Sequence, residues 1–165
     1  MLDLARSDNE LYEQPHSVLD FSALINEEVM NYEAVLFEKG FMMKCDVEEQ
    51  VKVSGVESQL RQLIGILLDN AGKYADPGSD IHLVLQKCGK KRCRLSVSDK
   101  GGPISGQDLK NIFKRFYQAD EARTQTGSYG LGLAIAQNIA DQHKGRIWAE
   151  SKDGLNTFYV ELPTK

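Results

Sequence analysis

The segment LRQLIGILLDNAGKYADPG, residues 60–78, has the strongest helical pattern in the chain. Its apolar residues recur at the spacing of one broad helix face; they are Leu60, Leu63, Ile64, Leu67, Leu68 and Ala71. The turn Asp76-Pro77-Gly78 ends the helix. So wide an apolar face has to be buried against other elements, so this helix is the predicted centre of the core.

Shorter elements flank this helix on both sides. Before it, Ser22 is placed to cap a helix that runs to about Lys39, and residues 17–20 form a candidate strand. After it, two alternating strands at 81–86 and 93–98 predict a hairpin. The other predicted elements are strands at 41–47, 51–53, 146–151 and 157–162 and helices at 105–113 and 131–142. This order predicts an α+β fold, with the helices on one face of a mixed sheet.

Composition limits the classes of function. A chain of 165 residues fits one domain, and its net charge of −4 argues against a nucleic-acid partner, because no net cationic field attracts phosphates. Its 3 cysteines form no Cys-x-x-Cys pair, which argues against a zinc cluster. No apolar stretch approaches the ~20 residues of a membrane span, and no signal peptide is visible. We therefore expect a cytoplasmic chain that makes no membrane contact.

Two further features have an expected structural role. Trp148 lies in an alternating strand, which favours a place in the core. The cations around residues 87–94 coincide with the predicted hairpin turn, which favours a solvated turn over a patch for an acidic partner.

Asn70 and Lys73 could serve chemistry on the central helix. They lie three residues apart, so their side chains share a surface with Ile66 and Tyr74. An amide oxygen is a ligand type that suits Mg²⁺, and a lysine on the same surface could contact a phosphate. The spacing alone is equally compatible with an amide that bonds across a loop and a solvated lysine.

Two glycine-rich segments could complete a nucleotide site. Asp99-Lys100-Gly101-Gly102-Pro103-Ile104 places an acid at a strand end, followed by glycines that allow close approach of a flat ligand. Residues 127–133, GSYGLGL, open a helix whose N-terminal amides can bind an anion. They match neither the dinucleotide-binding fingerprint nor the P-loop. Each segment alone could also be an ordinary turn.

Together these segments resemble the catalytic, ATP-binding domain of bacterial sensor histidine kinases, within the wider Bergerat fold of gyrase, Hsp90 and MutL. Four stretches match the family's motifs in order: residues 67–74 the N box, 99–104 the first glycine box, 112–117 the F box and 129–134 the second glycine box. Residues 143–151 and 157–163 are similar to the family's closing hairpin. The resemblance implies a two-layer α/β sandwich with a mixed, mostly antiparallel sheet.

The resemblance also implies a role for individual residues. Asn70 would ligate Mg²⁺, Lys73 would contact phosphate, and Asp99 would accept a hydrogen bond from the adenine 6-amino group. The other residues implied at the site are Tyr74, Gly101, Ile104 and Leu133 near the base and ribose, Gly130, Leu131 and Gly132 at the phosphates, and Thr157 as support of the adenine pocket. Residues 114–129 would be the ATP lid, with Phe113 and Phe116 as its anchor.

The function implied is binding of Mg-ATP and donation of the γ-phosphate to a histidine. None of His16, His82 and His143 is followed by an acidic residue, so the acceptor would lie elsewhere, on a dimerisation domain upstream. Residues 1–12 would be the tail of that domain's helix and a linker, and 13–165 the ATP-binding domain. The partners would be the dimerisation domain, in a homodimer, and a response regulator, in the cytoplasmic part of a membrane-anchored sensor.

Two alternatives remain open at the level of the sequence. The chain departs from the family pattern at Ile66, Pro103 and Gln118, which would suit a degenerate nucleotide-binding regulatory module. A free-standing ATPase of the same fold would need an acidic general base about one turn before Asn70. Ile66 occupies that position, which argues against the second alternative.

Overall fold

The computed structural model describes residues 14–117 and 131–165. Five strands form one sheet in the order β2-β4-β5-β7-β6. They are β2 (Met42–Val47), β4 (Asp80–Cys88), β5 (Arg92–Lys100), β7 (Leu155–Pro163) and β6 (Arg146–Lys152). Only the pair β2 and β4 is parallel, so the sheet is mixed and mostly antiparallel, as predicted.

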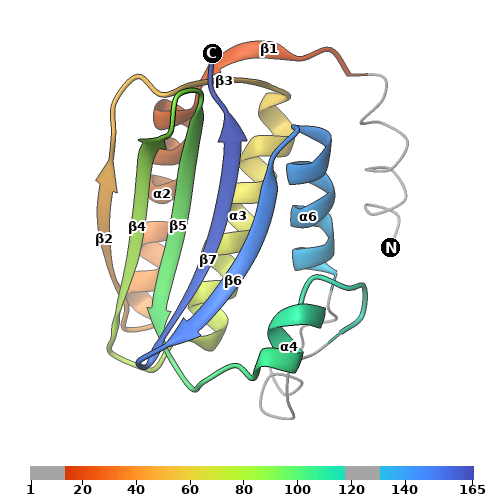
Figure 1. The fold of residues 1–165 in the computed structure, drawn as a ribbon. Helices are drawn as coiled ribbons and strands as arrows, with labels where there is room; N and C mark the ends of the chain where they lie inside the picture. Colours follow the sequence, from red (N-terminus) through yellow and green to blue (C-terminus); the bar gives the residue numbers. More distant parts are fainter. Residues whose placement is uncertain (1–13, 118–130) are drawn as a thin grey trace.

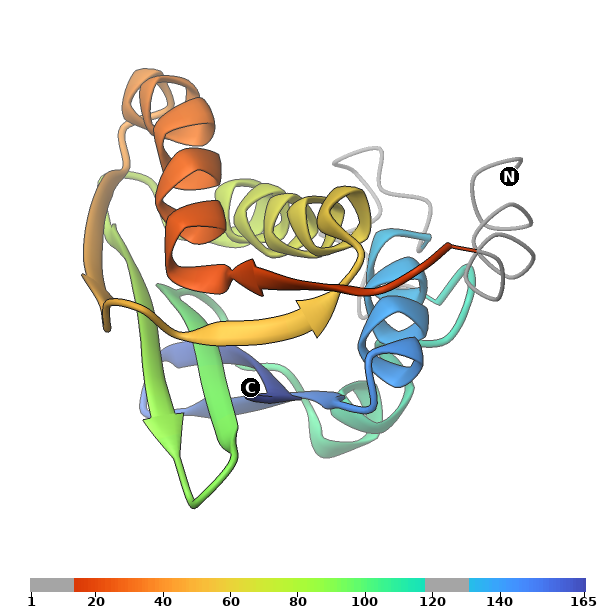
Figure 2. The same ribbon diagram turned by 90° about the horizontal axis from the view of Figure 1, so that it is seen from above.

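Three helices cover one face of this sheet (Figures 1 and 2). They are α2 (Phe21–Glu38), α3 (Glu57–Tyr74) and α6 (Gly132–Gln142); the short α4 (Gly106–Asn111) lies beside them at one end. A two-stranded ribbon of β1 (Ser17–Asp20) and β3 (Lys52–Gly55) crosses the other end. The result is the α+β, two-layer arrangement that the order of elements predicted.

The core lies between the helices and the sheet. Every apolar residue named for the central helix is at most 1% exposed, so the expected wide buried face of α3 is confirmed. Residues of β5 alternate between the two faces, and Cys93, Leu95 and Val97 point into the core. Within the described residues, no helix is long and apolar enough to cross a membrane.

The start of α2 differs from the prediction. Asp20, and not Ser22, caps the helix, because its carboxylate accepts a hydrogen bond from the N–H of Ala23 at 3.1 Å. Ser22 is buried; its hydroxyl donates to the carbonyl of Glu48 at 2.5 Å and accepts from the N–H of Val51 at 3.0 Å. The hydroxyl therefore holds the β2–β3 connection, a long-range contact that local capping rules do not include.

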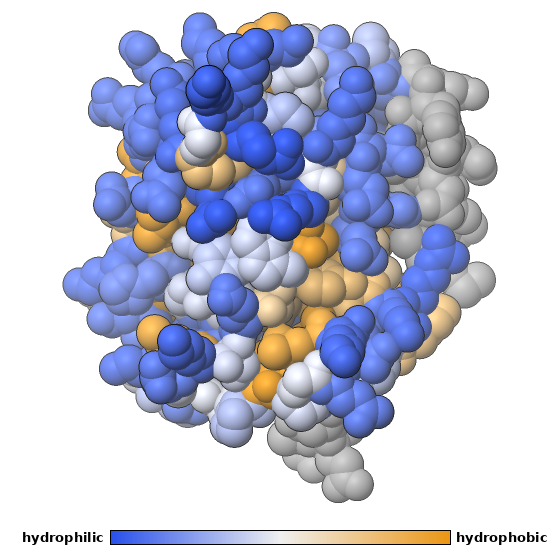
Figure 3. Space-filling view, viewed as in Figure 1, coloured by the Kyte–Doolittle hydropathy of each residue, from blue (hydrophilic) through white to orange (hydrophobic). Residues whose placement is uncertain are grey.

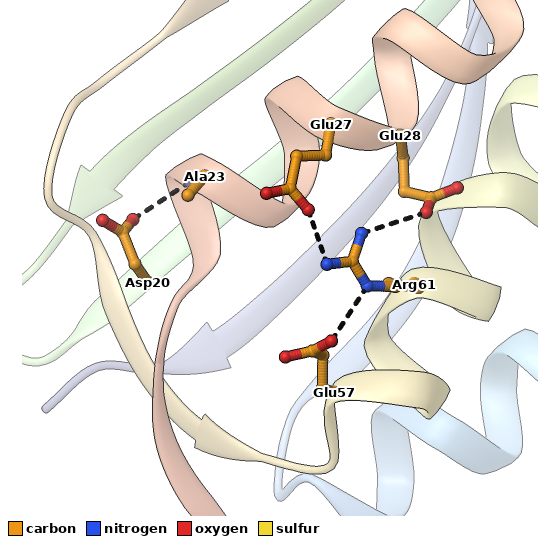
Figure 4. A network of polar contacts seen from close by, with 6 residues as sticks. All are labelled: Asp20, Ala23, Glu27, Glu28, Glu57 and Arg61. Carbon is orange, nitrogen blue, oxygen red and sulfur yellow. Dashed lines mark hydrogen bonds and ion pairs between the residues drawn. The ribbon is translucent and has the colours of Figure 1, made fainter.

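Arg61 of α3 joins α2 and α3 on their outer side (Figure 4). Its guanidinium contacts the carboxylates of Glu27 at 2.5 Å and Glu28 at 3.3 Å on α2, and of Glu57 at 3.2 Å on its own helix. The cation thus neutralises part of an acidic surface at the helix pair.

Figure 3 shows the outer face of the sheet from the front. There, blue hydrophilic side chains surround a pale and orange patch in the middle of the face. Trp148 lies on this side, stacked on Tyr159 at 5.0 Å between ring centroids, and Arg146 lies 4.4 Å from its ring. The expectation that Trp148 belongs to the core was therefore wrong; Ile147, one residue earlier, takes the inward position.

Candidate functional site

Asp99 lies at the end of β5, on the face of the sheet that the helices cover. It continues the inward series of Cys93, Leu95 and Val97 and is 2% exposed. A carboxyl group is rarely buried so deeply without a specific partner or role. Its position next to the loop that follows β5 marks this end of the sheet as the candidate site.

The loop 101–104 passes close to the carboxylate. A Cβ on Gly101 would lie 3.3 Å from the Asp99 Oδ1 and 3.1 Å from the carbonyl oxygen of Tyr74, so a larger residue would crowd both groups. A Cβ on Gly102 would meet no atom within 4 Å. The end of α3 and the end of β5 thus meet at a glycine, and open space lies beside it.

The N-terminus of α6 packs against α3 near Asn70. A Cβ on Gly132 would lie 3.5 Å from Cγ2 of Ile66, one turn before Asn70. Asn70 is half-buried. Lys73 forms an ion pair with Asp69 at 3.3 Å, and its side chain is 35% exposed. The structure therefore brings the N box beside the start of the helix that was expected to bind phosphates.

The other predicted apolar residues lie around the same end. Ile104 is 7% exposed and belongs to the core, and Leu131 and Leu133 pack against the core from the start of α6. Phe113 is buried and contacts Phe158 edge-to-face, with ring centroids 6.1 Å apart, as expected of an anchor.

Phe116 does not act as a second anchor in this structure. Its side chain is 63% exposed and its backbone has a φ of 64°. Residues 118–130, which include Gly130 and most of the expected lid, lie outside the described residues.

The strand register corrects the place of Thr157. It pairs with Ser98, and the two hydroxyl oxygens lie 2.9 Å apart on the outer face of the sheet. Asp99 pairs with Asn156, which is 1% exposed on the inner face. Because neighbouring residues of a strand point to opposite faces, the structure does not bring Thr157 to the carboxylate and puts Asn156 there.

Sequence reasoning missed Asn156 and its partner Ser151. The signal was present in the alternation of β7, since Phe158, Val160 and Leu162 are inward core residues and Asn156 stands two positions before the first of them. The family motif drew attention to the threonine instead.

Two of the three histidines, His143 and His16, lie at the C-terminal end of α6, opposite the end that packs near the N box. His143, at the end of α6, is 4% exposed; its Nε2 accepts the N–H of Val56 at 3.1 Å, and its Nδ1 lies 2.7 Å from the carbonyl oxygen of Ile139. Burial lowers the pKa of His143 below its ordinary value. His16 stacks on this ring at 4.9 Å, and His82 is exposed on β4.

The residues present fit an adenine nucleotide. A buried carboxylate at a strand end can accept a bond from an exocyclic amine, the glycine loop leaves room beside it, and a helix N-terminus lies close to the N box. Among the described residues, no three His, Cys, Asp or Glu side chains gather as a metal site. A Mg²⁺ ion would therefore depend on one amide oxygen, that of Asn70, and on nucleotide phosphates and water.

Comparisons with known proteins identify the family of the chain. The family model of the histidine kinase-, DNA gyrase B- and HSP90-like ATPases matches residues 55–165. The sensor protein DltS of Streptococcus agalactiae serotype III is 35% identical over 164 residues, which are 99% of this chain and 41% of DltS. The chain thus spans about two fifths of that relative's length.

Solved structures show the same fold. The catalytic domain of histidine kinase ThkA superposes with a TM-score of 0.81 at 24% identity, over 91% of this chain and 96% of that domain. ThkA in complex with the response regulator protein TrrA matches with a TM-score of 0.77 at 22% identity, over 91% of this chain and 42% of that one.

Proposed function

The chain belongs to the histidine kinase-, DNA gyrase B- and HSP90-like ATPase family, and from this membership we propose that it binds Mg-ATP and donates the γ-phosphate to a histidine on another domain. The observation that supports this most is the buried carboxylate of Asp99 beside an open glycine loop. A carboxylate there selects a base that offers an N–H donor at its edge, as adenine does with its 6-amino group.

Each residue of the site would have a distinct task. Asp99 would accept the adenine amine, and Gly101 and Gly102 would let the base lie against the backbone. Ile104 and Leu133 would contact the base, with Tyr74 beside the ribose. The amides at the start of α6, near Leu131 and Gly132, would bind phosphate oxygens.

The phosphate end would involve Asn70 and Lys73. Asn70 would hold Mg²⁺ through its amide oxygen, and the metal would supply neutralisation of phosphate charge. Lys73 would exchange its exposed ion pair with Asp69 for a phosphate contact. An exposed pair of this kind is weak, so the exchange costs little.

The phosphate acceptor would come from outside this chain. Both ring nitrogens of His143 are engaged, so neither is available for in-line attack. His16 stacks on that ring at the end of α6, and the exposed His82 pairs with Ser98 on the outer face of the sheet, the face that the helices do not cover. The expected partners are a dimerisation domain that carries the acceptor histidine, in a homodimer, and a response regulator, as in the ThkA–TrrA complex.

The relatives are named as sensor proteins, which supports a place in two-component signal transduction. We place this domain in the cytoplasmic portion of a membrane-anchored sensor kinase. Residues 1–12 would connect it to the dimerisation helix.

A labelling experiment tests the proposal. Incubation of this chain with Mg²⁺ and γ-labelled ATP should show nucleotide binding and no acid-labile label on the chain. Addition of the dimerisation domain of the full-length protein, as a separate polypeptide, should produce acid-labile label on that domain only. Absence of Mg-ATP binding would contradict the proposal and favour the degenerate regulatory module.

A further inference from the structure

Two side chains of the closing hairpin hold the first glycine loop. Ser151 of β6 accepts a hydrogen bond from the N–H of Ile104 at 2.9 Å and donates its own proton to the Oδ1 of Asn156 at 2.6 Å. Asn156 of β7 donates from its Nδ2 to the carbonyl of Gly102 at 3.0 Å. The loop is therefore bonded on both sides of Pro103, which has no N–H of its own.

The backbone adds a third connection between the same two segments. The N–H of Gly101 donates to the carbonyl of Gly154, in the turn between β6 and β7, at 3.2 Å. Gly101, Gly102 and Ile104 thus each have a partner in the hairpin. A loop with two adjacent glycines has high conformational entropy, which these bonds reduce before any ligand arrives.

The amide that holds the loop also stands next to the recognition carboxylate. Asn156 pairs with Asp99 across β5 and β7. The position that a Cβ of Gly101 would take lies 3.2 Å from Nδ2 of Asn156 and 3.3 Å from Oδ1 of Asp99. One buried amide therefore fixes the loop on one side and adjoins the carboxylate on the other.

We propose that Asn156, oriented by Ser151, is a positioning residue for base recognition, which sets the glycine loop at the separation from Asp99 that an adenine ring requires. This inference rests on the proposed function. Asn156 and Ser151 act through the loop and the carboxylate, so their loss weakens the specific bond to the 6-amino group more than the general affinity for a nucleoside triphosphate.

The test compares two nucleotides in Ser151→Ala, Ser151→Thr and a control. ATP is titrated in Mg²⁺ beside purine ribonucleoside triphosphate, which has hydrogen in place of the 6-amino group. Ser151→Ala removes the acceptor of Ile104 and the donor to Asn156, and Ser151→Thr keeps the hydroxyl on a residue that suits a strand. Ser98→Ala is the matched control, because it removes a hydroxyl bond from the outer face of β5.

In Ser151→Ala we expect ATP affinity to fall roughly fivefold to tenfold, the loss that about one or two hydrogen bonds account for. The preference for ATP over the purine analogue should shrink with it. Ser151→Thr should restore both quantities, and Ser98→Ala should change neither. In the nucleotide-free chain, hydrogen exchange at the Ile104 amide should be faster in Ser151→Ala, which confirms that the loop was released.

Two results would overturn the inference. One is a Ser151→Ala protein with unchanged affinity and preference; the other is an equal loss for both nucleotides, which indicates a merely structural role. If the unsubstituted chain binds neither nucleotide, the proposed function fails, and this inference fails with it. If the unsubstituted chain binds and prefers ATP, any failure concerns the positioning role alone.

Discussion

Two carboxyl groups are buried on the neighbouring strands β5 and β7, and their surroundings differ. Glu161, 5% exposed on the outer face, is enclosed by the guanidinium groups of Arg94 at 2.6 Å, Arg146 at 3.2 Å and Arg92 at 3.6 Å. Asp99, 2% exposed on the inner face, shares the space around Gly101 with the amide of Asn156 and the carbonyl of Tyr74.

The contrast separates a structural carboxylate from a recognition carboxylate. Three cations occupy the oxygens of Glu161, so that group holds β5, β6 and β7 together on their outer face. Asp99 lies beside a glycine loop, and a Cβ on Gly102 of that loop would meet no atom within 4 Å. An exocyclic amine that enters this open space could donate to the carboxylate, as the proposed function requires.

The largest expected effect is on stability, in Glu161→Gln. The substitution leaves three arginines around a neutral amide. Because their side chains are 36–64% exposed, water still solvates the cations, and the loss amounts to about 2 kcal/mol of unfolding free energy, the scale of a hydrogen bond to a charged group. Chemical denaturation measures it. The control is Glu150→Gln, which neutralises an exposed carboxylate of β6, and it should change stability little. An equal loss of unfolding free energy in the two variants would contradict the structural role of Glu161.

The same carboxylate predicts a pH dependence. Burial alone would raise the pKa of Glu161, but hydrogen bonds from Arg94 and Arg146 outweigh it and hold that pKa below its ordinary value. The stability that Glu161 contributes is therefore present above the ordinary glutamate pKa, about 4.3, and is lost as the pH falls toward the lower folded-state value.

Denaturation of the unsubstituted chain and Glu161→Gln across this acidic range checks the dependence. Their stability difference should shrink as the pH falls. His143 also reduces stability as the pH falls, starting below about 6.5. Burial lowers the pKa of its imidazole in the folded chain, so the unfolded chain takes up the proton first. That loss is common to both proteins and cancels in the difference. A difference that stays constant in acid would contradict the role of the charge.

A smaller effect is expected on the outer face near Asp99. Thr157→Val keeps the shape of the side chain and removes the contact with Ser98, at a cost of about 0.5–1 kcal/mol of stability. Affinity for Mg-ATP should be unchanged, because the side chain points away from the carboxylate. Isothermal titration measures this, and a clear loss of affinity would restore Thr157 to the pocket and contradict the register.

The smallest effect is expected at Arg61. Its network has the opposite arrangement of charges to that of Glu161. Here one cation meets three carboxylates, and the side chains of two of them, Glu27 and Glu57, are 56% exposed. Arg61→Gln should shift the thermal midpoint no more than ordinary surface substitutions do, because solvent screens these pairs. A loss as large as that of Glu161→Gln would show that burial is not what distinguishes the networks.

Much of this fold follows from local patterns in the sequence. The apolar spacing of α3 and the alternation of β4 and β5 lead directly to the helix, the hairpin and the two-layer arrangement. Asp99 and Asn70 were chosen from the sequence as candidate site residues, because an acid at a strand end and an amide beside an apolar face are unusual. Asp99 is buried at the end of β5 and Asn70 is half-buried on α3, and their roles in binding stay predictions.

Three of the errors, at Ser22, Trp148 and Thr157, share one cause: long-range contacts decide between residues that are close in the sequence. Asp20 and Ser22 can both cap a helix, and Ser22 is instead drawn to the β2–β3 connection. Trp148 and Thr157 were each placed on the wrong face of the sheet, since a shift of one residue reverses the direction of a side chain. The face to which each strand residue points depends on how the strand packs against other elements. The residue types near the strand do not show that packing.

The most direct test of the central claim is a titration of the folded chain and Asp99→Ala with Mg-ATP and Mg-GTP. The account predicts that the unsubstituted chain binds ATP more tightly than GTP, whose 6-position is a carbonyl that faces an acceptor. It also predicts that Asp99→Ala loses on the order of 1–3 kcal/mol of ATP binding free energy and most of that preference. Unchanged ATP affinity in a folded Asp99→Ala protein would contradict the assignment of Asp99 as the recognition carboxylate.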